Sequence, residues 1–321
     1  MLAPALPLIL LVAGAALLTA GAEGFAEHVT GAASRLGVSV LALGLLLAGA
    51  EPEEAVTAML ASGQGHPALA AGDAIGANLV ILTLTLGLAA LVTRLPVGRS
   101  ALQYGLAAAV AGAVAWGLLL NGVLGRPEGL VLVLLYAGGV VWVWQREQQP
   151  PLIGELAELE ESGRGDPGDD DEDATGRALL FVLLGVLGMV VGGALAVRGA
   201  EGLVEVFDVG ESVIGLTVLA LATSAEMVAL VWAARRRGLS DLVVAGTVGA
   251  VAYNATVTLG LAALVSPLVL GQHNVILSVA AVTAVLPLVL LASRRSGILP
   301  PSLGALLVLG YVAAMGFLLA R

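Results

Sequence analysis

Apolar runs long enough to cross a lipid bilayer recur along most of the chain. A transmembrane helix needs about 20 consecutive, mostly apolar residues, and runs of this kind can be marked ten times in the 321 residues. They lie near residues 4–22, 37–62, 67–93, 101–124, 128–145, 178–199, 211–234, 241–265, 275–293 and 300–320. The pattern therefore predicts an all-α polytopic membrane protein with ten transmembrane helices.

The two halves of the chain repeat one another. GAEGFAE at Gly21–Glu27 and GAEGLVE at Gly199–Glu205 are identical at five of seven positions, and each stands at the end of an apolar run. A second match follows further along each half, between Gly72–Gly87 and Gly246–Gly260. We interpret the chain as a duplication of a five-helix unit. The predicted parts are a first repeat at 1–146, an acidic linker at 147–177 and a second repeat at 178–321.

An odd number of spans in each repeat gives the two copies opposite orientations in the membrane. Cytoplasmic loops carry an excess of arginine and lysine, and all 14 basic residues of this chain are arginine. With the N-terminus outside, eleven arginines fall on the cytoplasmic side, and only Arg126, Arg198 and Arg321 fall outside. This bias predicts a multi-pass protein of the cell membrane with both termini outside and the linker in the cytoplasm. Inverted repeats of this kind are typical of secondary transporters.

Composition narrows the chemistry that the chain can perform. Hydrophobic residues make up 59% of the chain and charged residues 12%, and ten of the 24 acids lie in Pro150–Arg177. The formal charge of −10 therefore describes the linker more than the membrane part. The chain has no cysteine, which excludes disulfides and thiolate metal sites. It also has no GxxxxGK[ST] motif, so the expected energy source is an ion gradient rather than a nucleotide.

Three glutamates interrupt one of the most apolar runs. In LLLAGAEPEEAVTAML, residues 45–60, Glu51, Glu53 and Glu54 surround Pro52. A carboxylate at the centre of a spanning helix costs on the order of 2.5–3.5 kcal/mol, and a proline distorts the helix that holds it. We therefore predict two half-helices with a polar break between them. Helical spacing would place Glu51 and Glu54 on one face and Glu53 on the other.

The second half has a matching interruption, where Thr223, Ser224 and Glu226 break an apolar run. Carboxylates, hydroxyls and the carbonyls that helix breaks free together form an oxygen-rich site. Such a site suits hard cations such as Ca²⁺ or Na⁺ better than zinc or copper.

One sequence offset is common to both halves. Glu53 lies 28 residues before Ile81, and Glu226 lies 28 residues before Asn254. Glu53 and Glu226 are therefore the predicted symmetry-related pair of carboxylates.

Other polar residues receive a plainer interpretation. Glu23 and Glu201, in the repeated GAEG, are expected at helix ends near the membrane interface, with a place on the ion pathway as the alternative. Asp73 and Asp241 are expected at or near the ends of spans. No metal role is assigned to the histidines, which have no ligand spacing and are His28, His66 and His273.

The interrupted runs resemble the alpha-repeats of the cation/calcium exchanger superfamily, in particular those of sodium/calcium exchanger-like membrane proteins. Each alpha-repeat of that family has the form G-T-S-x-P-E followed by G-S-N-x-x-N. The first half of this chain reads AGAEPEE and GANLVI, and the second half reads ALATSAEM and GAVAYN. The resemblance implies two inverted five-helix repeats and secondary antiport of cations, with exchange of Ca²⁺ for Na⁺, or for H⁺, as the first expectation.

The resemblance also implies roles for individual residues. Glu53 and Glu226 would be the central carboxylates, Asn254 would add an amide oxygen, and Thr223 and Ser224 would add hydroxyl or backbone oxygens. The full set of candidate cation ligands is Glu53, Glu226, Asn254, Thr223, Ser224, Asn78, Glu54 and Glu51.

The chain departs from the family pattern in both halves. The first half has Gly49 and Ala50 in place of the Thr-Ser pair, and Ile81 in place of the final polar residue. The second half lacks the proline, and its glutamate comes one residue early, a spacing closer to the G-N-A-x-E of the cation/proton branch. Glu54 and Met227 are therefore alternative occupants of the family's glutamate position.

We expect a transporter rather than an enzyme, with no cofactor besides the transported cations. Its partners would be inorganic cations and the lipid bilayer, with no nucleic acid. Two alternatives remain: a cation/proton antiporter for monovalent ions, and a cation channel or sensor without obligatory exchange.

Overall fold

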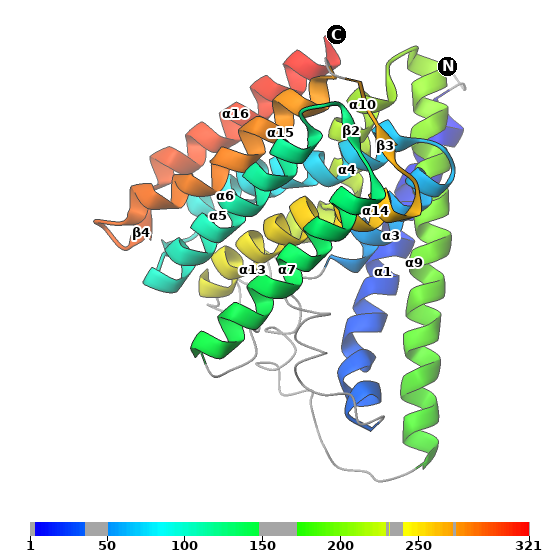
Figure 1. Ribbon diagram of the computed structural model, residues 1–321, viewed down its shortest axis with the longest axis horizontal. Coiled ribbons are helices and arrows are strands. Elements are labelled where there is room, and N and C mark those ends of the chain that lie inside the picture. The colour runs from blue at the N-terminus through cyan, green and yellow to red at the C-terminus, as the bar shows by residue number, and fades with distance from the viewer. Residues whose placement is uncertain are drawn as a thin grey trace.

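The computed structural model describes residues 4–35, 51–147, 172–228, 231, 240–271 and 274–320, and these are mostly helical (Figure 1). Eight helices in this part are long and apolar enough to cross a membrane, and they coincide with eight of the ten predicted runs. The other two runs, 37–62 and 211–234, lie partly outside the described residues. Their described parts include the shorter helical segments Pro52–Gly63 and Glu211–Thr223, and residues 224–228 follow the second of these.

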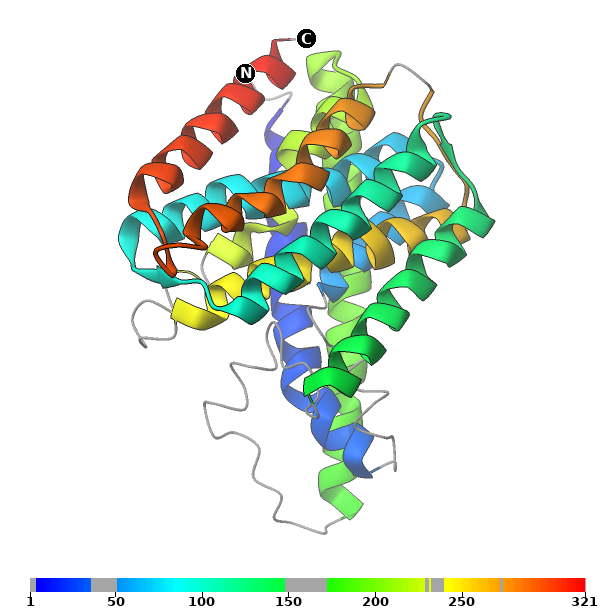
Figure 2. The same ribbon diagram turned by 60° about the vertical axis from the view of Figure 1, so that its left-hand side comes forward.

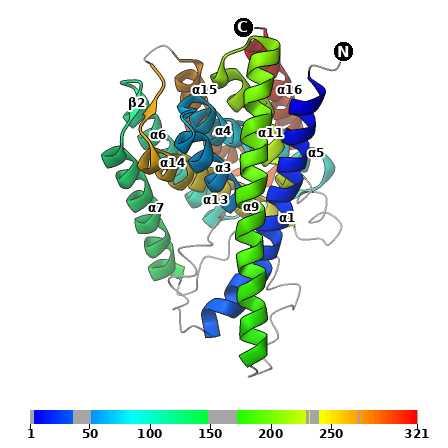
Figure 3. The same ribbon diagram turned by 90° about the vertical axis from the view of Figure 1, so that its right-hand side faces the viewer.

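Two long antiparallel helices, α1 (Ala5–Arg35) and α9 (Glu172–Phe207), pack along one another (Figure 3). Glycines set their close approach. A Cβ at Gly14 would lie 2.5 Å from the Ala196 backbone nitrogen, and one at Gly21 would lie 2.7 Å from the Gly185 carbonyl oxygen. Small residues at such contacts let membrane helices pack backbone to backbone. We call these two helices the α1–α9 pair.

The remaining elements form a bundle beside this pair (Figures 1 and 2). In the first half they are α3 (Pro52–Gly63), α4 (Pro67–Leu79), η1 (Val80–Thr85), α5 (Leu86–Val92), β1 (Leu95–Pro96), α6 (Arg99–Leu119), β2 (Val123–Leu124) and α7 (Arg126–Glu147). In the second half they are α10 (Glu211–Ile214), η2 (Gly215–Leu219), α11 (Ala220–Thr223), α13 (Ser240–Tyr253), η3 (Asn254–Thr258), α14 (Leu259–Val265), β3 (Leu268–Val269), α15 (Val275–Val285), η4 (Leu286–Ser293), β4 (Ile298–Leu299) and α16 (Pro301–Leu319).

The two halves of the bundle have matching structures. α5 and α14 have the same sequence, LGLAALV, and each follows a stretch of π-helix, η1 or η3. Gly87 of α5 packs against α16, where a Cβ would lie 2.9 Å from the Gly304 carbonyl oxygen. Gly260 of α14 packs against α7 in the same way, at 2.7 Å from the Gly129 carbonyl oxygen.

Two short antiparallel strand pairs show how the halves are related. β1 pairs with β4, and β2 pairs with β3, so each pair takes one strand from each half. Exchanging the halves turns one strand pair into the other, because β1 corresponds to β3 and β2 to β4. The two pairs lie at opposite ends of the bundle (Figure 1). The predicted inverted relation of the two repeats is therefore present in the fold.

Candidate cation-binding site

The second of the two predicted half-helices in the first repeat is α3, and the half-helix expected before it lies outside the described residues. Helix α3 begins at Pro52, a favourable position for a residue without a backbone N–H. Glu51 stands outside the helix with φ −111° and ψ 75°. Helical spacing therefore does not apply to Glu51, and the expectation that it shares a face with Glu54 is wrong.

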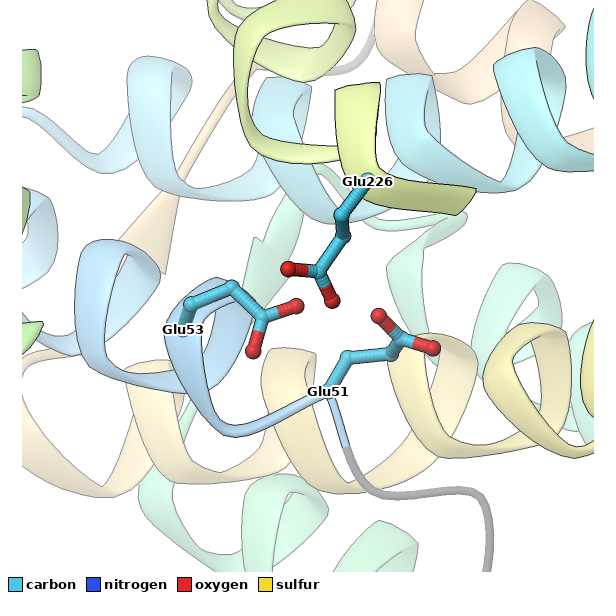
Figure 4. Close-up of side chains that lie close together, drawn as sticks. All are labelled: Glu51, Glu53 and Glu226. Carbon is cyan, nitrogen blue, oxygen red and sulfur yellow. The ribbon is translucent and has the colours of Figure 1, made fainter. Parts of the chain in front are cut away.

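Three carboxylates converge at this break (Figure 4). One oxygen from each of Glu51, Glu53 and Glu226 lies within 4.8 Å of the other two. Glu51 and Glu53 are 5% and 1% exposed, and Glu226 is partly buried. The predicted pair of Glu53 and Glu226 is thus brought together across the two repeats, with Glu51 as a third member. We call these three residues the carboxylate cluster.

Glu54 points to the other repeat as well, through a different partner. Ser224 donates a hydrogen bond of 2.7 Å to Oε1 of Glu54, and both side chains are fully buried. Oε2 of Glu54 has no hydrogen-bond partner in the part of the chain that the structure describes. Met227, the alternative residue of the second repeat, is buried among apolar side chains. Glu53 and Glu54 both face the second repeat. The direction of the side chain therefore fits either residue as the family's glutamate.

Asp73 belongs to the same region, and the sequence prediction for it is wrong. It lies within α4, inside the Pro67–Val92 span, and is fully buried rather than at a span end. Thr223 donates a 3.0 Å hydrogen bond to its Oδ1, and its Oδ2 lacks a partner within the described ranges. Consecutive residues at the second break, Thr223 and Ser224, therefore each bind a carboxylate of the first repeat. The family motif has no acid at this position, so the motif could not indicate Asp73. Its place in an apolar run was the signal available.

The α1–α9 pair also reaches the carboxylate cluster. Thr19 and Glu23 of α1 both lie within electrostatic range of Glu226. Of the two GAEG acids, Glu23 thus lies beside the candidate site, and Glu201 makes a separate contact described below.

The two candidate asparagines form hydrogen bonds with residues other than the clustered carboxylates. Asn78 donates a 3.2 Å hydrogen bond to the Val251 carbonyl oxygen, and Asn254 accepts one of 2.9 Å from Thr258. Asn78 Oδ1 and Asn254 Nδ2 are buried and have no partner among the residues described. Their role as cation ligands stays a prediction.

The site has strong negative charge and oxygen ligands. Glu51, Glu53, Glu54, Asp73 and Glu226 lie in one buried region, with Glu54 in electrostatic range of Glu51, Asp73 and Glu226. Helices α3, α4, α11 and α13 contain no lysine or arginine. Buried carboxylates need cations, protons or basic side chains to offset their charge. An all-oxygen ligand set suits Ca²⁺ or Na⁺.

Comparison with known proteins decides the family. The family model for sodium/calcium exchanger proteins matches residues 6–145 and 177–320, which is most of the chain. The chain belongs to the sodium/calcium exchanger family. It is therefore a multi-pass membrane protein and a cation antiporter, as the alpha-repeat resemblance implied.

Individual relatives and structures agree with this membership. The inner membrane protein YrbG of Escherichia coli strain K12 is 29% identical over 299 residues, covering 88% of this chain and 85% of its own length. Membrane protein MJ0091 of Methanocaldococcus jannaschii is 27% identical over 251 residues, covering 76% and 74%. The sodium-calcium exchanger NCX_Mj, in crystals soaked with 2.5 mM Na⁺ and 0.1 mM Ca²⁺, has the same fold, with a TM-score of 0.61 at 22% identity over 97% of this chain and 98% of its own.

Proposed function

We propose that this antiporter exchanges Ca²⁺ for Na⁺, or for H⁺, at the carboxylate cluster. The observation that carries the proposal is the convergence of buried Glu51 and Glu53 with partly buried Glu226, from two inverted repeats. Ca²⁺ takes six to eight oxygen ligands at about 2.3–2.6 Å. Three carboxylates can supply up to six of them, so little further coordination is required. The names of the sodium-calcium exchanger NCX_Mj and of the family model support the same pair of ions.

Charge balance gives a physical reason for exchange. One Ca²⁺ offsets two of the negative charges that the five carboxylates can carry. When Ca²⁺ leaves, the negative charge must be offset again before the site can face the other side of the membrane. Na⁺ or H⁺ can offset it at the same oxygens. Competition for one set of carboxylates would thus couple the two ion flows.

The position of the site between the α1–α9 pair and the bundle suits alternating access. The carboxylate cluster lies at the start of α3, and Thr19 of the α1–α9 pair lies within electrostatic range of Glu226. A movement of the pair relative to the bundle would therefore change the surroundings of Glu226. We propose that this movement exposes the site to one side of the membrane and then to the other. The proposed orientation has both termini outside and the 147–177 linker in the cytoplasm, on the arginine bias. The parts that we assign are the repeats 1–146 and 178–321 on either side of that linker.

Counterflow in reconstituted vesicles tests the proposal. Vesicles loaded with ⁴⁵Ca should lose it when Na⁺, or H⁺, is supplied on the opposite side, and should retain it in choline buffer. K⁺ should not replace the coupling ion. Efflux that is indifferent to the ions on the opposite side would indicate a channel, and exchange of Na⁺ for H⁺ without Ca²⁺ movement would indicate the monovalent antiporter.

A further inference from the structure

A second polar cluster lies away from the carboxylates and joins the two repeats. His66, in the turn between α3 and α4, lies 2.8 Å from Glu201 through Nε2 and 2.8 Å from Glu211 through Nδ1. Glu201 belongs to α9, and Glu211 begins α10. The three side chains are between 28% and 32% exposed, so water and protons can reach them.

The geometry of this cluster suits a charged ring. A neutral imidazole has one N–H donor and one acceptor nitrogen, so one of two flanking carboxylates would face a lone pair. A protonated ring donates to both. Histidine side chains change charge between about pH 5 and 8. Glu201 and Glu211 contact opposite nitrogens of His66, so the three residues do not converge on a single metal ion.

The cluster of His66, Glu201 and Glu211 also connects the α1–α9 pair to the bundle. Glu201 lies near the end of α9 in the α1–α9 pair, whereas the His66 turn and Glu211 belong to the bundle. Figure 3 shows this end of α9 on the same side of the molecule as the N-terminus.

Few other charges surround the ring. The described charged residues on the facing part of α9, on the α9–α10 turn, and on α4, α10, β3 and α15 are Arg198, Glu201, Glu205, Asp208, Asp73 and Glu211. Glu201 and Glu211 are the two of these that contact His66. His273 lies outside the described residues.

We propose that His66 is a proton-controlled latch between the α1–α9 pair and the bundle. The protonated ring binds Glu201 and Glu211 together and holds α9 against the bundle at this end. Loss of the proton separates one carboxylate from the ring and lets the pair move. His66 is a positioning residue in this scheme, since it does not contact the carboxylate cluster. The effect on transport rests on the proposed alternating access, but the latch itself can be measured without transport.

A distance measurement tests the latch directly. The chain has no cysteine, so spin labels can be placed at Leu120→Cys in the bundle and Phe207→Cys at the end of α9, which are 52% and 57% exposed. At about pH 5.5 the label distance should have a single narrow distribution, and at about pH 8 a second, longer population should appear, because histidine changes charge over this range. With His66→Gln the longer population should be present at both pH values. A distribution that is equally narrow at both pH values, or a shift that His66→Gln leaves unchanged, would overturn the latch.

Glu211→Gln gives a sharper test, because this variant should keep the latch closed at high pH, whereas His66→Gln should open it at both pH values. A neutral ring can donate to Glu201 and accept from the new amide, so both contacts can form without a second ring proton. The short distance should then persist to about pH 8, outside the range in which the wild-type latch is closed. Opening of this variant at the same pH as the wild type would contradict the requirement for a charged ring.

Exchange measured against pH on each side of the vesicle membrane tests the consequence for transport. Acidification on the side of the latch should slow the wild type by about two- to fivefold more than His66→Gln, as expected if opening must break one partly exposed ion pair. His28→Gln is the matched control, since His28 bonds Gly24 of its own helix and stacks on Phe181 within the α1–α9 pair. It should keep the wild-type profile. If the distance shift occurs but no exchange does, the proposed function fails and the latch stands. If exchange occurs with identical pH profiles for the wild type and His66→Gln, the latch has no part in transport.

Discussion

The two helix breaks occupy equivalent places in the inverted repeats, yet they supply different sets of side chains to the site. The first break contributes carboxylates, from Glu51, Glu53 and Glu54 around Pro52. The second contributes one carboxylate, Glu226, and two hydroxyl donors, since Ser224 binds Glu54 and Thr223 binds Asp73. Most of the carboxylates therefore come from the first repeat, and the hydroxyl donors come from the second. A symmetric scaffold thus holds an asymmetric site.

Glu53 and Glu226 are the pair that the symmetry preserves, and their neutralisation should have the largest effect. Glu53→Gln and Glu226→Gln keep the side-chain shape but remove a charge from each side of the carboxylate cluster. We expect each to lower Ca²⁺ exchange by at least about 100-fold, since changes to residues that merely support metal ligands already cost about 10–100-fold. Initial rates of ⁴⁵Ca exchange in vesicles measure the effect.

Glu205→Gln is the matched control for both variants, because Glu205 is an exposed acid near the end of α9. It should exchange at the wild-type rate. Full activity in both cluster variants would show that Glu53 and Glu226 are structural. A loss in only one of them would show that the asymmetry of the site extends to its central pair.

The sequence predicted the parts of this comparison that duplication preserves. Repeated glycines, the common 28-residue offset and the apolar runs indicated the inverted scaffold and the pair of Glu53 and Glu226. The sequence did not predict that Asp73 joins the site. An acidic residue in an apolar run can lie either at the end of a span or inside the protein, and the run itself does not distinguish the two. The sequence also misplaced Glu51, since a helical wheel assumes a helix on both sides of Pro52. The positions of Asp73 and Glu51 depend on contacts between the two repeats, and a local sequence pattern does not show such contacts.

Asp73 is the clearest divergence between the halves, and removing its charge should have an intermediate effect. Asp73→Asn can still accept the hydrogen bond from Thr223, so the fold should persist while the buried charge is lost. We expect the KM for Ca²⁺ to rise by about three- to tenfold, which corresponds to ~0.7–1.4 kcal/mol of binding, with the maximal rate changed little. Exchange rates across a range of Ca²⁺ concentrations measure both quantities.

Asp208→Asn is a suitable control for this substitution. Asp208 is an exposed acid in the turn after α9, with φ 52°, a conformation that asparagine adopts readily. It should leave the KM unchanged. An unchanged KM in Asp73→Asn as well would make Asp73 a support for Thr223 and remove it from the cation site.

Where the halves remain alike, equal substitutions should have equal effects. A Cβ at Gly87 would lie 2.9 Å from the Gly304 carbonyl oxygen, and one at Gly260 would lie 2.7 Å from that of Gly129. Gly87→Ala and Gly260→Ala should each destabilise the protein by about 1–3 kcal/mol, the usual cost of overpacking. Thermal unfolding in detergent should give similar drops in Tm for both. Gly138→Ala, where the added Cβ meets nothing within 4 Å, is the control and should not lower it. A drop in only one of the pair would show that the scaffold has diverged too.

The smallest expected effect comes from the pair Thr85 and Thr258, which stand at the same place in the two repeats. Thr258 donates a 2.9 Å hydrogen bond to Asn254, whereas Ile81 stands in the corresponding position of the first repeat and leaves the buried Thr85 hydroxyl without a partner among the described residues. Thr258→Val should therefore lower stability by about 1 kcal/mol, because it removes a hydrogen bond and leaves Asn254 unsatisfied. Thr85→Val removes an unsatisfied polar atom and should leave stability unchanged or raise it slightly. Parallel melting curves of the two variants measure the difference. Equal losses in Tm would mean that the Thr85 hydroxyl has a partner after all, and that Ile81 has not broken the symmetry of the hydrogen bonds.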